Sequence, residues 1–438
     1  MTESQRRTFL KTAGMSAVAL TMSSQNGRAS QKSDLLKVAV IGTGGMGSFH
    51  VGVLAGRKDV ELAYVCDVDT TRLAKAAKRV ESAKGKAPVA VKDMREILDD
   101  QTVDAVFIAT PDHWHAPAAI LALDAGKHVY VEKPCCHNIR EGQLLVEAVR
   151  RTGKLLQVGT QSRSTDCVKE AIQRVKEGEI GEVLVTKTWN TQKRRSIGKT
   201  QPSQPPKHLD FDLWVGPAPM VEYRSNLLHG IWRWWYDFGC GDIGNDGVHD
   251  IDVGLWGFGA QTHPTRATCF GGKLYFDDDQ QFPDTQYAMF EYPTDSKPEG
   301  RKKQFIFEQR IWTPYNQDGY DNGAAFYGTG GVMIVGHAVG WRLYGPRNKL
   351  IAERSDPVSL PAHHTNFFDC IRGTQKQLNA NVHMGHRAAT LVHLANIGAR
   401  VGGVLEFDPQ SEKITSSVDA AILARREYRE KHWATPIG

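Results

Sequence analysis

A short apolar run, LLKVAVI at residues 35–41, leads directly into the glycine-rich segment GTGGMG at residues 42–47. A strand followed by G-x-G-x-x-G and then by a helix is the context in which this motif binds a dinucleotide. Gly42 permits the tight turn, Gly44 lets the backbone approach a pyrophosphate, and Gly47 allows the helix to pack closely on the strand. The first N–H groups of that helix have no partner within the helix and face the phosphates, so the segment predicts a dinucleotide site.

A carboxylate at the end of the next expected strand favours NAD as that dinucleotide. Asp67 lies twenty residues after Gly47 and ends the run AYVCD at residues 63–67. At this place a carboxylate can accept hydrogen bonds from both ribose hydroxyls and repels a 2′-phosphate, so we expect NAD rather than NADP. Arg72 is interpreted as a solvated side chain on the helix that follows. The residues expected to contact the cofactor here are Gly42, Gly44, Gly45, Met46, Gly47 and Asp67.

The segment from residue 35 to residue 158 alternates between strand-like and helix-like patterns. This alternation predicts a parallel sheet covered by helices on both faces, which is a Rossmann-type doubly wound domain at 35–158. The expected strands are 35–41, 60–66, 103–109, 128–131 and 155–158, and the clearest helices are 71–83 and 138–151.

The pattern changes after residue 158. Residues 191–222 are rich in Pro, Gln, Lys and Ser and predict a long irregular excursion, a kind of segment that is often functional. Between about 264 and 345 no helix-length segment separates the strands, which favours an antiparallel sheet. The second domain, 159–438, is therefore expected to be α+β, with a large and mostly antiparallel sheet. Its expected elements include strands at 182–189, 286–292 and 304–312 and helices at 167–176, 366–372, 387–401 and 418–431.

Two further motifs follow expected strands of the first domain. TPDHWH occupies residues 110–115, and EKP occupies residues 132–134 after the run GKHVYV. Both lie at the carboxyl ends of parallel strands, where open α/β sheets bind ligands. With the glycine segment, these motifs closely resemble the Gfo/Idh/MocA family of sugar and polyol oxidoreductases, over residues 35 to 410. The cofactor contacts expected from these motifs are Thr110, Pro111, His115, Glu132 and Lys133.

Lys133 is the expected catalytic lysine. Beside a nicotinamide its ammonium can donate a hydrogen bond to the substrate oxygen and stabilise alkoxide charge, and the family resemblance implies this role. A lowered pKa would also let it exchange a proton. The alternative is a surface lysine that is ion-paired with Glu132.

The segment GCGDIGNDGVHDID at residues 239–252 resembles the D-x-x-x-H-x-x-D helix of the family. The resemblance implies that His249 is the general base that takes the hydroxyl proton. The alternative is a capped core histidine at a domain interface. Asn245 stands where the family usually has aspartate, so the charge that would polarise His249 is missing, and Asp246 is a possible substitute. Residues 245 and 249 are four apart, so both should face the cleft.

An aromatic segment, HGIWRWWY at residues 229–236, comes just before that motif. Functionally, the ring of Trp235 would pack on a sugar face while Arg233, Asn245 and Asp246 bind hydroxyls. The alternative is a hydrophobic plug or a subunit interface. His363 and His364 could in principle bind a metal, but no metal is predicted, because no Cys, Asp or Glu stands near them at ligand spacing.

The first thirty residues resemble a twin-arginine signal peptide. Arg6 and Arg7 are followed by FLK and then by a mildly apolar stretch to residue 22. The protein is therefore predicted to lie in the periplasm or to be exported elsewhere outside the cytoplasm. This route exports folded proteins, which fits seven widely spaced cysteines that do not look like a disulfide framework.

The composition excludes several classes of partner. Four of the 54 basic and one of the 49 acidic residues lie within residues 1–30, which leaves 50 and 48 and a net charge of +2. This balance gives no electrostatic case for nucleic acid. The sequence has no apolar stretch of about 18 residues, the length that a membrane span needs, so no membrane span is predicted.

These observations predict an NAD(H)-dependent oxidoreductase that moves hydride to or from a hydroxyl carbon of a sugar, polyol or glycoside. One alternative is an NAD-dependent glycosidase that works by transient oxidation and elimination, and another is a non-catalytic sugar-binding protein. Because free NAD is scarce outside the cytoplasm, we expect a tightly held cofactor. The resemblance further implies a homo-oligomer, a dimer or a tetramer, that pairs through the open face of the second-domain sheet.

Overall fold

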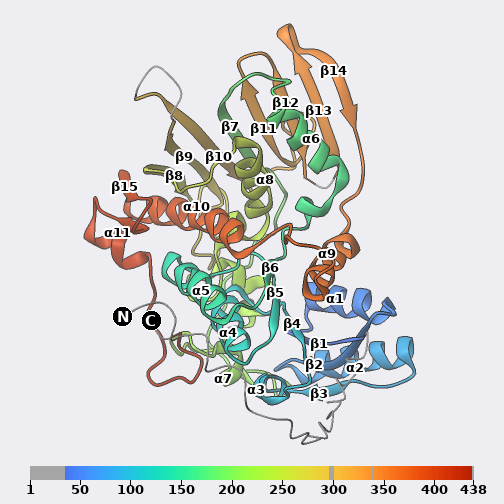
Figure 1. The fold of residues 1–438 in the computed structure, drawn as a ribbon. Helices are drawn as coiled ribbons and strands as arrows, with labels where there is room; N and C mark the ends of the chain where they lie inside the picture. The colour runs from blue at the N-terminus through green and yellow to red at the C-terminus, as the bar shows by residue number, and fades with distance from the viewer. Residues whose placement is uncertain (1–34, 295–299, 338, 437–438) are drawn as a thin grey trace, which may run out of the picture. The chain divides into compact units, whose positions relative to one another are not determined.

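A computed structural model describes residues 35–294, 300–337 and 339–436 of the chain. The predicted signal peptide at 1–30 lies outside these residues. The described residues from Leu36 onward form one compact unit built on two sheets (Figure 1). The change from one sheet to the other falls between residues 158 and 183, close to the predicted domain boundary.

The first sheet has six described strands in the order β3-β2-β1-β4-β5-β6, all parallel. The strands are β1 Leu36–Ile41, β2 Val60–Cys66, β3 Val89–Val91, β4 Ala105–Ile108, β5 His128–Val131 and β6 Leu156–Val158. The helices between them are α1 Gly45–Gly56, α2 Thr70–Lys84, α3 Arg95–Asp99, α4 Asp112–Asp124 and α5 Ile139–Thr152. The predicted doubly wound domain is confirmed.

Buried apolar side chains cover both faces of this sheet. One layer holds side chains of α1 and α2 together with Phe367 and Phe368, which come from the C-terminal half of the chain. The other layer holds side chains of α4 and α5 together with Val382 and Ala389. The first sheet therefore packs against its own crossover helices and against two helices from the second half of the chain.

The second sheet has ten described strands in the order β14-β13-β12-β11-β7-β10-β9-β8-β15-β16. Only β7 and β10 pair in parallel, so the expectation of a large, mostly antiparallel sheet is confirmed. The strands are β7 Val183–Asn190, β8 Arg266–Gly272, β9 Thr285–Pro293, β10 Lys302–Arg310, β11 Asn322–Gly328, β12 Val332–Gly336, β13 Gly340–Gly345, β14 Lys349–Arg354, β15 Val404–Asp408 and β16 Lys413–Ile414.

The second half of the chain also contains helices and helical turns, some of which pack on this sheet. The helices are α6 Asp166–Lys176, α7 Phe211–Val215, α8 Val248–Phe258, α9 Leu360–Arg372, α10 Val382–Val401 and α11 Val418–Leu423. The helical turns are η1 Gln161–Ser164, η2 Ser225–Leu227, η3 Ile231–Trp234, the π-helical η4 Ile243–Gly247, and η5 Pro346–Asn348. Side chains of α6, α8 and α10 share the core with the sheet. On the other face Tyr287, Met289 and Tyr327 are exposed.

The last helix is shorter than the sequence suggested. We expected a helix over 418–431, but α11 ends at Leu423. The following residues reach back to the first half of the chain, where Arg426 pairs with Glu141 at 2.7 Å and Tyr428 donates to the same carboxylate at 2.8 Å. These tertiary contacts outweigh the helical propensity of the segment.

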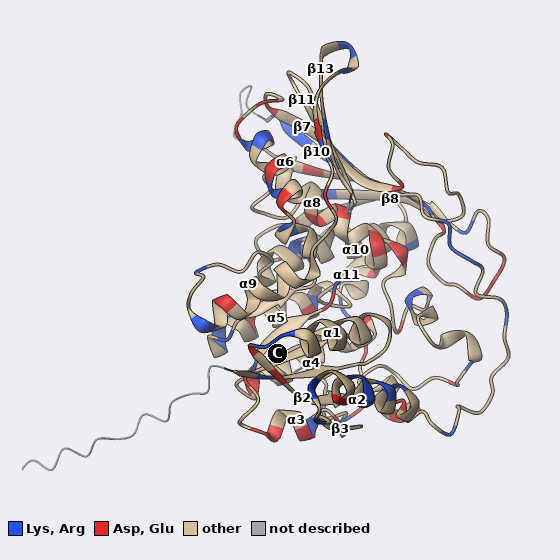
Figure 2. Cartoon of the chain, turned by 90° about the vertical axis from the view of Figure 1, so that its right-hand side faces the viewer, with Lys and Arg blue, Asp and Glu red and all other residues tan. Residues whose placement is uncertain are grey.

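Acidic and basic positions are interspersed along the ribbon of both halves, as the red and blue segments of Figure 2 show. Helix α2 is an exception, since it carries Arg72, Lys75, Lys78, Arg79 and Lys84 against one glutamate. Among the described helices, none is both long enough and apolar enough to cross a membrane.

Three buried histidines join the two halves of the chain. The ring nitrogens of His113, His363 and His393 face the carbonyl oxygens of Trp214 at 3.0 Å, Val158 at 2.9 Å and Cys136 at 3.2 Å. Burial lowers the pKa of His113 and His393 to about 3 and that of His363 to about 4. All three rings are therefore neutral in the folded protein at neutral pH.

We expect this arrangement to make the fold sensitive to acid. Because the unfolded rings take up protons below about pH 6.5 and the folded rings do not, stability falls from there towards pH 4. At pH 5 each of the three histidines lowers the free energy of unfolding by roughly 2 kcal/mol. Between pH 7.5 and pH 5, the free energy of unfolding measured in urea should therefore fall by roughly 2 kcal/mol less for His363→Gln than for the wild type. The same change at the exposed His383 is the control for replacing a histidine, and equal slopes for His363→Gln and wild type would contradict the prediction.

Candidate active site

The glycine segment forms the tight turn between β1 and α1. Gly42 has a φ of +85°, and a Cβ there would lie 2.7 Å from the carbonyl oxygen of Ala109. A Cβ on Gly47 would lie only 1.7 Å from the carbonyl oxygen of Gly42. Gly45 faces open space and begins α1. The turn thus brings bare backbone and the N-terminus of a helix to the same spot, which suits a pyrophosphate.

A cavity of about 360 Å³ opens at this turn. The predicted site residues that line it are Gly44, Gly45, Met46, Asp67, Thr110, Pro111, His115, Glu132, Lys133 and Arg233. Gly42 and Gly47 lie beneath it, where they shape the turn. Asn245, Asp246, His249 and Trp235 do not line it. The sequence also missed several lining residues, which are Val68, Asp69, Arg72, Ala109, Asp112, Leu209, Trp214, His229, Gly230 and Trp232.

Asp67 directly follows β2, and its carboxylate is fixed in place. Oδ2 accepts from the backbone N–H of Thr43 at 2.7 Å and from its hydroxyl at 2.9 Å, and Oδ1 accepts from the N–H of Asp69 at 2.9 Å. A carboxylate offers about four acceptor sites, so one is left for a ribose hydroxyl. Its negative charge beside Asp69 disfavours a 2′-phosphate, although Arg72 also lines the cavity.

The irregular excursion covers the cavity beside Asp67. Its backbone pairs with the end of β2, since Asp210 donates its N–H to Val68 at 2.9 Å and Thr70 donates to His208 at 2.9 Å. Nε2 of His229 lies 3.2 Å from the carboxylate of Asp69. Residues 208–210 of the excursion are therefore held to the segment that follows β2, and Leu209 lines the cavity.

Lys133 lies where the two halves of the chain meet. Its Nζ donates to the backbone carbonyl oxygen of Asn245 at 2.5 Å. The preceding Glu132 is buried, accepts from His50 at 2.9 Å and takes the N–H of Lys133 at 3.3 Å. Although burial raises it, the His50 bond and the charge of Lys133 hold the pKa of Glu132 below its usual value. Since the carboxylate pairs with His50, the lysine ammonium is left facing the cavity and not bound to Glu132.

His115 ties the two strand-end motifs together. Its Nδ1 lies 2.7 Å from the carbonyl oxygen of Pro134, and its Nε2 lies 2.9 Å from that of Thr110. Carbonyl oxygens only accept, so both contacts are hydrogen bonds only when both ring nitrogens carry hydrogen. His115 thus holds the loop that carries Lys133 against the loop that begins α4.

Asn245 sits between a cation and an anion. Its Oδ1 accepts from Nε of Arg233 at 2.8 Å, and its Nδ2 donates to Oδ1 of Asp242 at 3.0 Å. Only an amide can do both, which gives a physical reason for Asn in place of the aspartate of the family pattern. Arg194 pairs with Asp242 at 3.1 Å and also with Asp246. Asp246 is therefore held in an ion pair with Arg194. This pairing limits its ability to polarise His249 in place of the aspartate of the family pattern.

We expect Asn245→Asp to destabilise the protein by about 1–3 kcal/mol at neutral pH, because it places a second carboxylate against the buried Asp242. Urea unfolding measures this directly. Asn348→Asp, at an exposed position, is the matched control and should change stability by less than about 0.5 kcal/mol. An Asn245→Asp variant as stable as the wild type would mean that Asp242 does not need an amide partner.

His249 begins the first turn of α8, one turn after the carbonyl oxygen that holds Lys133. Its ring lies 5.1 Å from the ring of His337, whose Nδ1 is 3.2 Å from the carboxylate of Asp250. Burial and the charges of Lys133 and His337 keep the pKa of His249 well below its usual value. Although burial lowers it, Asp250 raises the pKa of His337. The lowered pKa favours a neutral His249 ring that can act as a base. No motif in the sequence pointed to His337.

The aromatic segment divides between two environments. Trp232 and Arg233 reach the cavity, and the guanidinium of Arg233 stacks on the Trp232 ring at 4.3 Å. Trp235 instead donates to the carbonyl oxygen of Asn226 at 3.0 Å and packs in a small core with Leu227. The structure thus places Trp235 in packing, whereas Trp214 and Trp232 line the cavity.

Comparison with known protein families defines the class as an NAD-binding oxidoreductase. Residues 36–160 match the family described as "Oxidoreductase family, NAD-binding Rossmann fold". Residues 182–264 and 345–434 match "Oxidoreductase family, C-terminal alpha/beta domain". The chain belongs to the Gfo/Idh/MocA family of oxidoreductases, as its motifs predicted.

Individual relatives are distant. The scyllo-inositol 2-dehydrogenase (NAD(+)) of Bacillus subtilis is 26% identical over 302 residues, 69% of this chain and 74% of the relative. A glycosyl hydrolase family 109 protein of Shewanella putrefaciens is 29% identical over 202 residues, 41% of this chain. The match covers only 44% of that relative's length.

Solved structures share the fold. The WlbA dehydrogenase from Bordetella pertussis, in complex with NADH and UDP-GlcNAcA, has a TM-score of 0.64 at 19% identity, covering 85% of this chain and 99% of its own. Levoglucosan dehydrogenase in complex with NADH has a TM-score of 0.62 at 18% identity, covering 84% and 98%. At these identities the likeness concerns the fold.

Proposed function

We propose that the protein is an NAD(H)-dependent oxidoreductase that moves hydride to or from a hydroxyl carbon of a sugar, polyol or glycoside. The observation that carries this proposal is the position of the Lys133 ammonium, held at the cavity edge by the carbonyl oxygen of Asn245, one turn before the neutral His249. The family membership and the names of its relatives, an inositol dehydrogenase among them, support it.

The residues of the cavity fit a nicotinamide dinucleotide. The glycine turn leaves space for a pyrophosphate at the N-terminus of α1, and Asp67 keeps one acceptor site for ribose. Thr110, Pro111 and Glu132 would line the far end beside Lys133. When bound, the nicotinamide supplies the acceptor or donor of the hydride.

Two side chains of the protein would handle the proton. In oxidation, the lone pair of the neutral His249 takes the proton of the substrate hydroxyl. The ammonium of Lys133 donates a hydrogen bond to the same oxygen and stabilises its growing negative charge. Arg233, which lines the cavity and is held by the amide of Asn245, is placed to bind a neighbouring hydroxyl. In reduction the same residues return the proton.

A sugar panel with product analysis tests this proposal. Purified protein is mixed with NAD⁺ and sugars, polyols and glycosides, and both nicotinamide absorbance and released aglycone are recorded. Net NADH formed from a sugar or polyol supports the dehydrogenase. If neither NADH nor aglycone forms and the protein binds no NAD(H), the proposal fails, and a non-catalytic sugar-binding role takes its place.

A second candidate is an NAD-dependent glycosidase. It is favoured by the 29% identity to glycosyl hydrolase family 109 proteins, which exceeds that to the inositol dehydrogenase. Oxidation at one carbon acidifies the neighbouring C–H, and loss of that proton expels the glycosidic substituent and forms a C=C bond. Water then adds to this bond and the hydride returns to the carbonyl carbon, so no net NADH accumulates. Aglycone release without net NADH would support this reaction over simple dehydrogenation.

We further propose that the cofactor is tightly held and that the protein is exported by the twin-arginine route. The docked excursion around Asp69 supports slow cofactor release, and seven cysteines without a disulfide fit export after folding. Lysine in place of both Arg6 and Arg7 should keep the unprocessed protein in the cytoplasm. Processing and export unchanged by that double variant would contradict the route.

We also propose a homo-oligomer that pairs through the open face of the second sheet. Tyr287 and Met289 on β9 and Tyr327 on β11 are exposed there. Light scattering should give a dimer or tetramer for the wild type and a smaller species for Tyr287→Lys. A monomeric wild type would contradict this proposal.

A further inference from the structure

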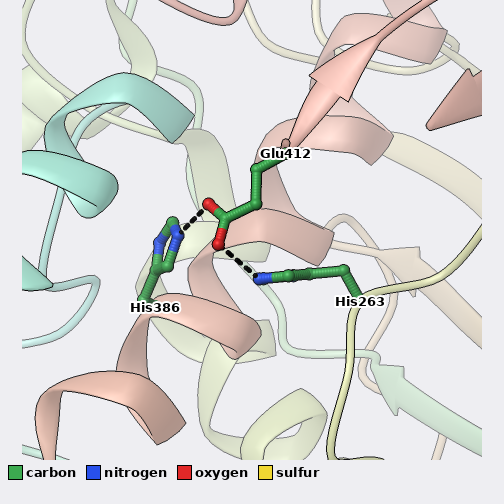
Figure 3. A group of neighbouring side chains, drawn as sticks. All are labelled: His263, His386 and Glu412. Atoms are coloured by element: carbon green, nitrogen blue, oxygen red, sulfur yellow. Dashed lines mark hydrogen bonds and ion pairs between the residues drawn. The ribbon is translucent and has the colours of Figure 1, made fainter. Parts of the chain in front are cut away.

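A second cluster of polar side chains lies away from the cavity. His263, between α8 and β8, and His386, on α10, converge on Glu412, which lies in the turn between β15 and β16 (Figure 3). Nε2 of His386 lies 2.6 Å from one carboxylate oxygen, and Nε2 of His263 lies 3.3 Å from the other. None of the three lines the cofactor cavity.

The cluster is buried and held firmly. His263 is 6% exposed and His386 is 3% exposed. Glu412 has a φ of 52°, and its carbonyl oxygen accepts from Gln143 at 3.5 Å. Helix α5 leaves space for the His386 ring at Gly142, where a Cβ would lie 2.1 Å from Nδ1. Three elements that are far apart in the sequence are thus fixed around one point.

The charge of the cluster is unbalanced. Each carboxylate oxygen of Glu412 faces an imidazole nitrogen, one from His386 and one from His263. Among the described residues Glu412 has no lysine or arginine partner. A neutral imidazole and an ionised carboxylate are the protonation states that bind metal ions.

The geometry also suits a metal ion. The three ligand atoms all lie within 4.8 Å of one another. In a tetrahedral site with metal–ligand bonds of about 2.0–2.2 Å, the ligand atoms lie roughly 3.4 Å apart. The three ligand atoms of this cluster would therefore need to move by only about 1 Å to bind an ion. The Nδ1 atoms of His263 and His386 are buried and have no hydrogen-bond partner among the described residues. Each ring therefore meets Glu412 through its Nε2 atom. The side chain of Glu412 is 22% exposed, which leaves one side for a water ligand.

We propose that His263, His386 and Glu412 bind one divalent transition-metal ion, of which Zn²⁺ is the best match to two nitrogens and one carboxylate. The ion fastens the β15–β16 turn and α10 to the segment that leaves α8. This site is independent of the proposed hydride chemistry.

Metal content and Co²⁺ spectroscopy test this site on the untagged protein. After incubation with Zn²⁺ and dialysis, elemental analysis should find about one ion per chain, and Zn²⁺ should raise the unfolding midpoint by about 2–5 °C. Co²⁺ should give d–d bands typical of a four-coordinate site without thiolate. Glu412→Gln, which keeps the shape of the side chain, should lose the ion and the shift, whereas Glu406→Gln on the same hairpin should keep both.

Three outcomes would overturn the proposal. They are no retained ion in the wild type, equal retention by Glu412→Gln, and a Co²⁺–thiolate charge-transfer band, which would place the ion on a cysteine. NADH binding by Glu412→Gln should equal that of the wild type, and this shows that the variant is folded.

Discussion

Replacing Lys133 with methionine should reduce turnover by about 10²- to 10⁴-fold, because it removes the donor that stabilises charge on the substrate oxygen. Methionine keeps the length of the side chain, so the cavity retains its shape. Affinity for NAD(H) should change by less than about tenfold, since phosphate and ribose contacts come from the glycine turn and Asp67. Steady-state rates with a responsive sugar and a NADH titration check the two halves of the prediction.

The control for this variant is Lys78→Met, at an exposed lysine on α2 outside the cavity lining, which should keep full turnover. Urea unfolding of Lys133→Met shows whether loss of the bond to the Asn245 carbonyl weakens the fold. Unchanged turnover in a folded Lys133→Met variant would remove the lysine from the mechanism.

Two glycines of the same motif should respond to substitution in opposite ways. A Cβ on Gly44 would meet only the far end of the Arg72 side chain, at 2.9 Å, so Gly44→Val should fold normally. The new side chain would occupy the space where a pyrophosphate meets the backbone, and affinity for NADH should fall roughly 100-fold. NADH titration followed by tryptophan fluorescence measures this loss, since Trp214 and Trp232 line the cavity.

Gly47→Ala should instead destabilise the protein by roughly 2–4 kcal/mol, because its Cβ would collide with the backbone of Gly42. Urea unfolding of both variants separates the two effects. A Gly44→Val protein that binds NADH like the wild type, or a Gly47→Ala protein of unchanged stability, would contradict the roles given to these residues.

Much of the fold could be predicted from local patterns. Apolar runs that end in glycine or in a carboxylate marked the strands of the first domain, because parallel strands are buried on both faces. The order of the ten-stranded sheet could not be predicted, since β7 pairs with β10 and β11 across more than a hundred residues. The end of α11 was missed because contacts of Arg426 and Tyr428 with Glu141 decide it, and these are not visible in sequence.

The site could be predicted where motifs carried it. The glycine turn, Asp67 and the loops at Thr110 and Lys133 lie together around one cavity, as strand ends in a parallel sheet should. The tertiary partners of the motif residues could not be read. His50 orients Glu132, and His337 lies beside His249, yet neither stands in a recognisable pattern. The same is true of His263, His386 and Glu412, which only the fold brings together.

Hydride transfer between a substrate carbinol and a nicotinamide at Lys133 and His249 is the central claim. Its most direct test uses sugars and polyols that carry deuterium on each hydroxyl-bearing carbon, incubated with the protein and NAD⁺, with mass analysis of the cofactor. We predict that one deuterium appears on the nicotinamide with at least one substrate and that Lys133→Met abolishes this transfer. Substrate conversion with a cofactor that stays unlabelled, or no label from any member of the panel, would contradict the claim.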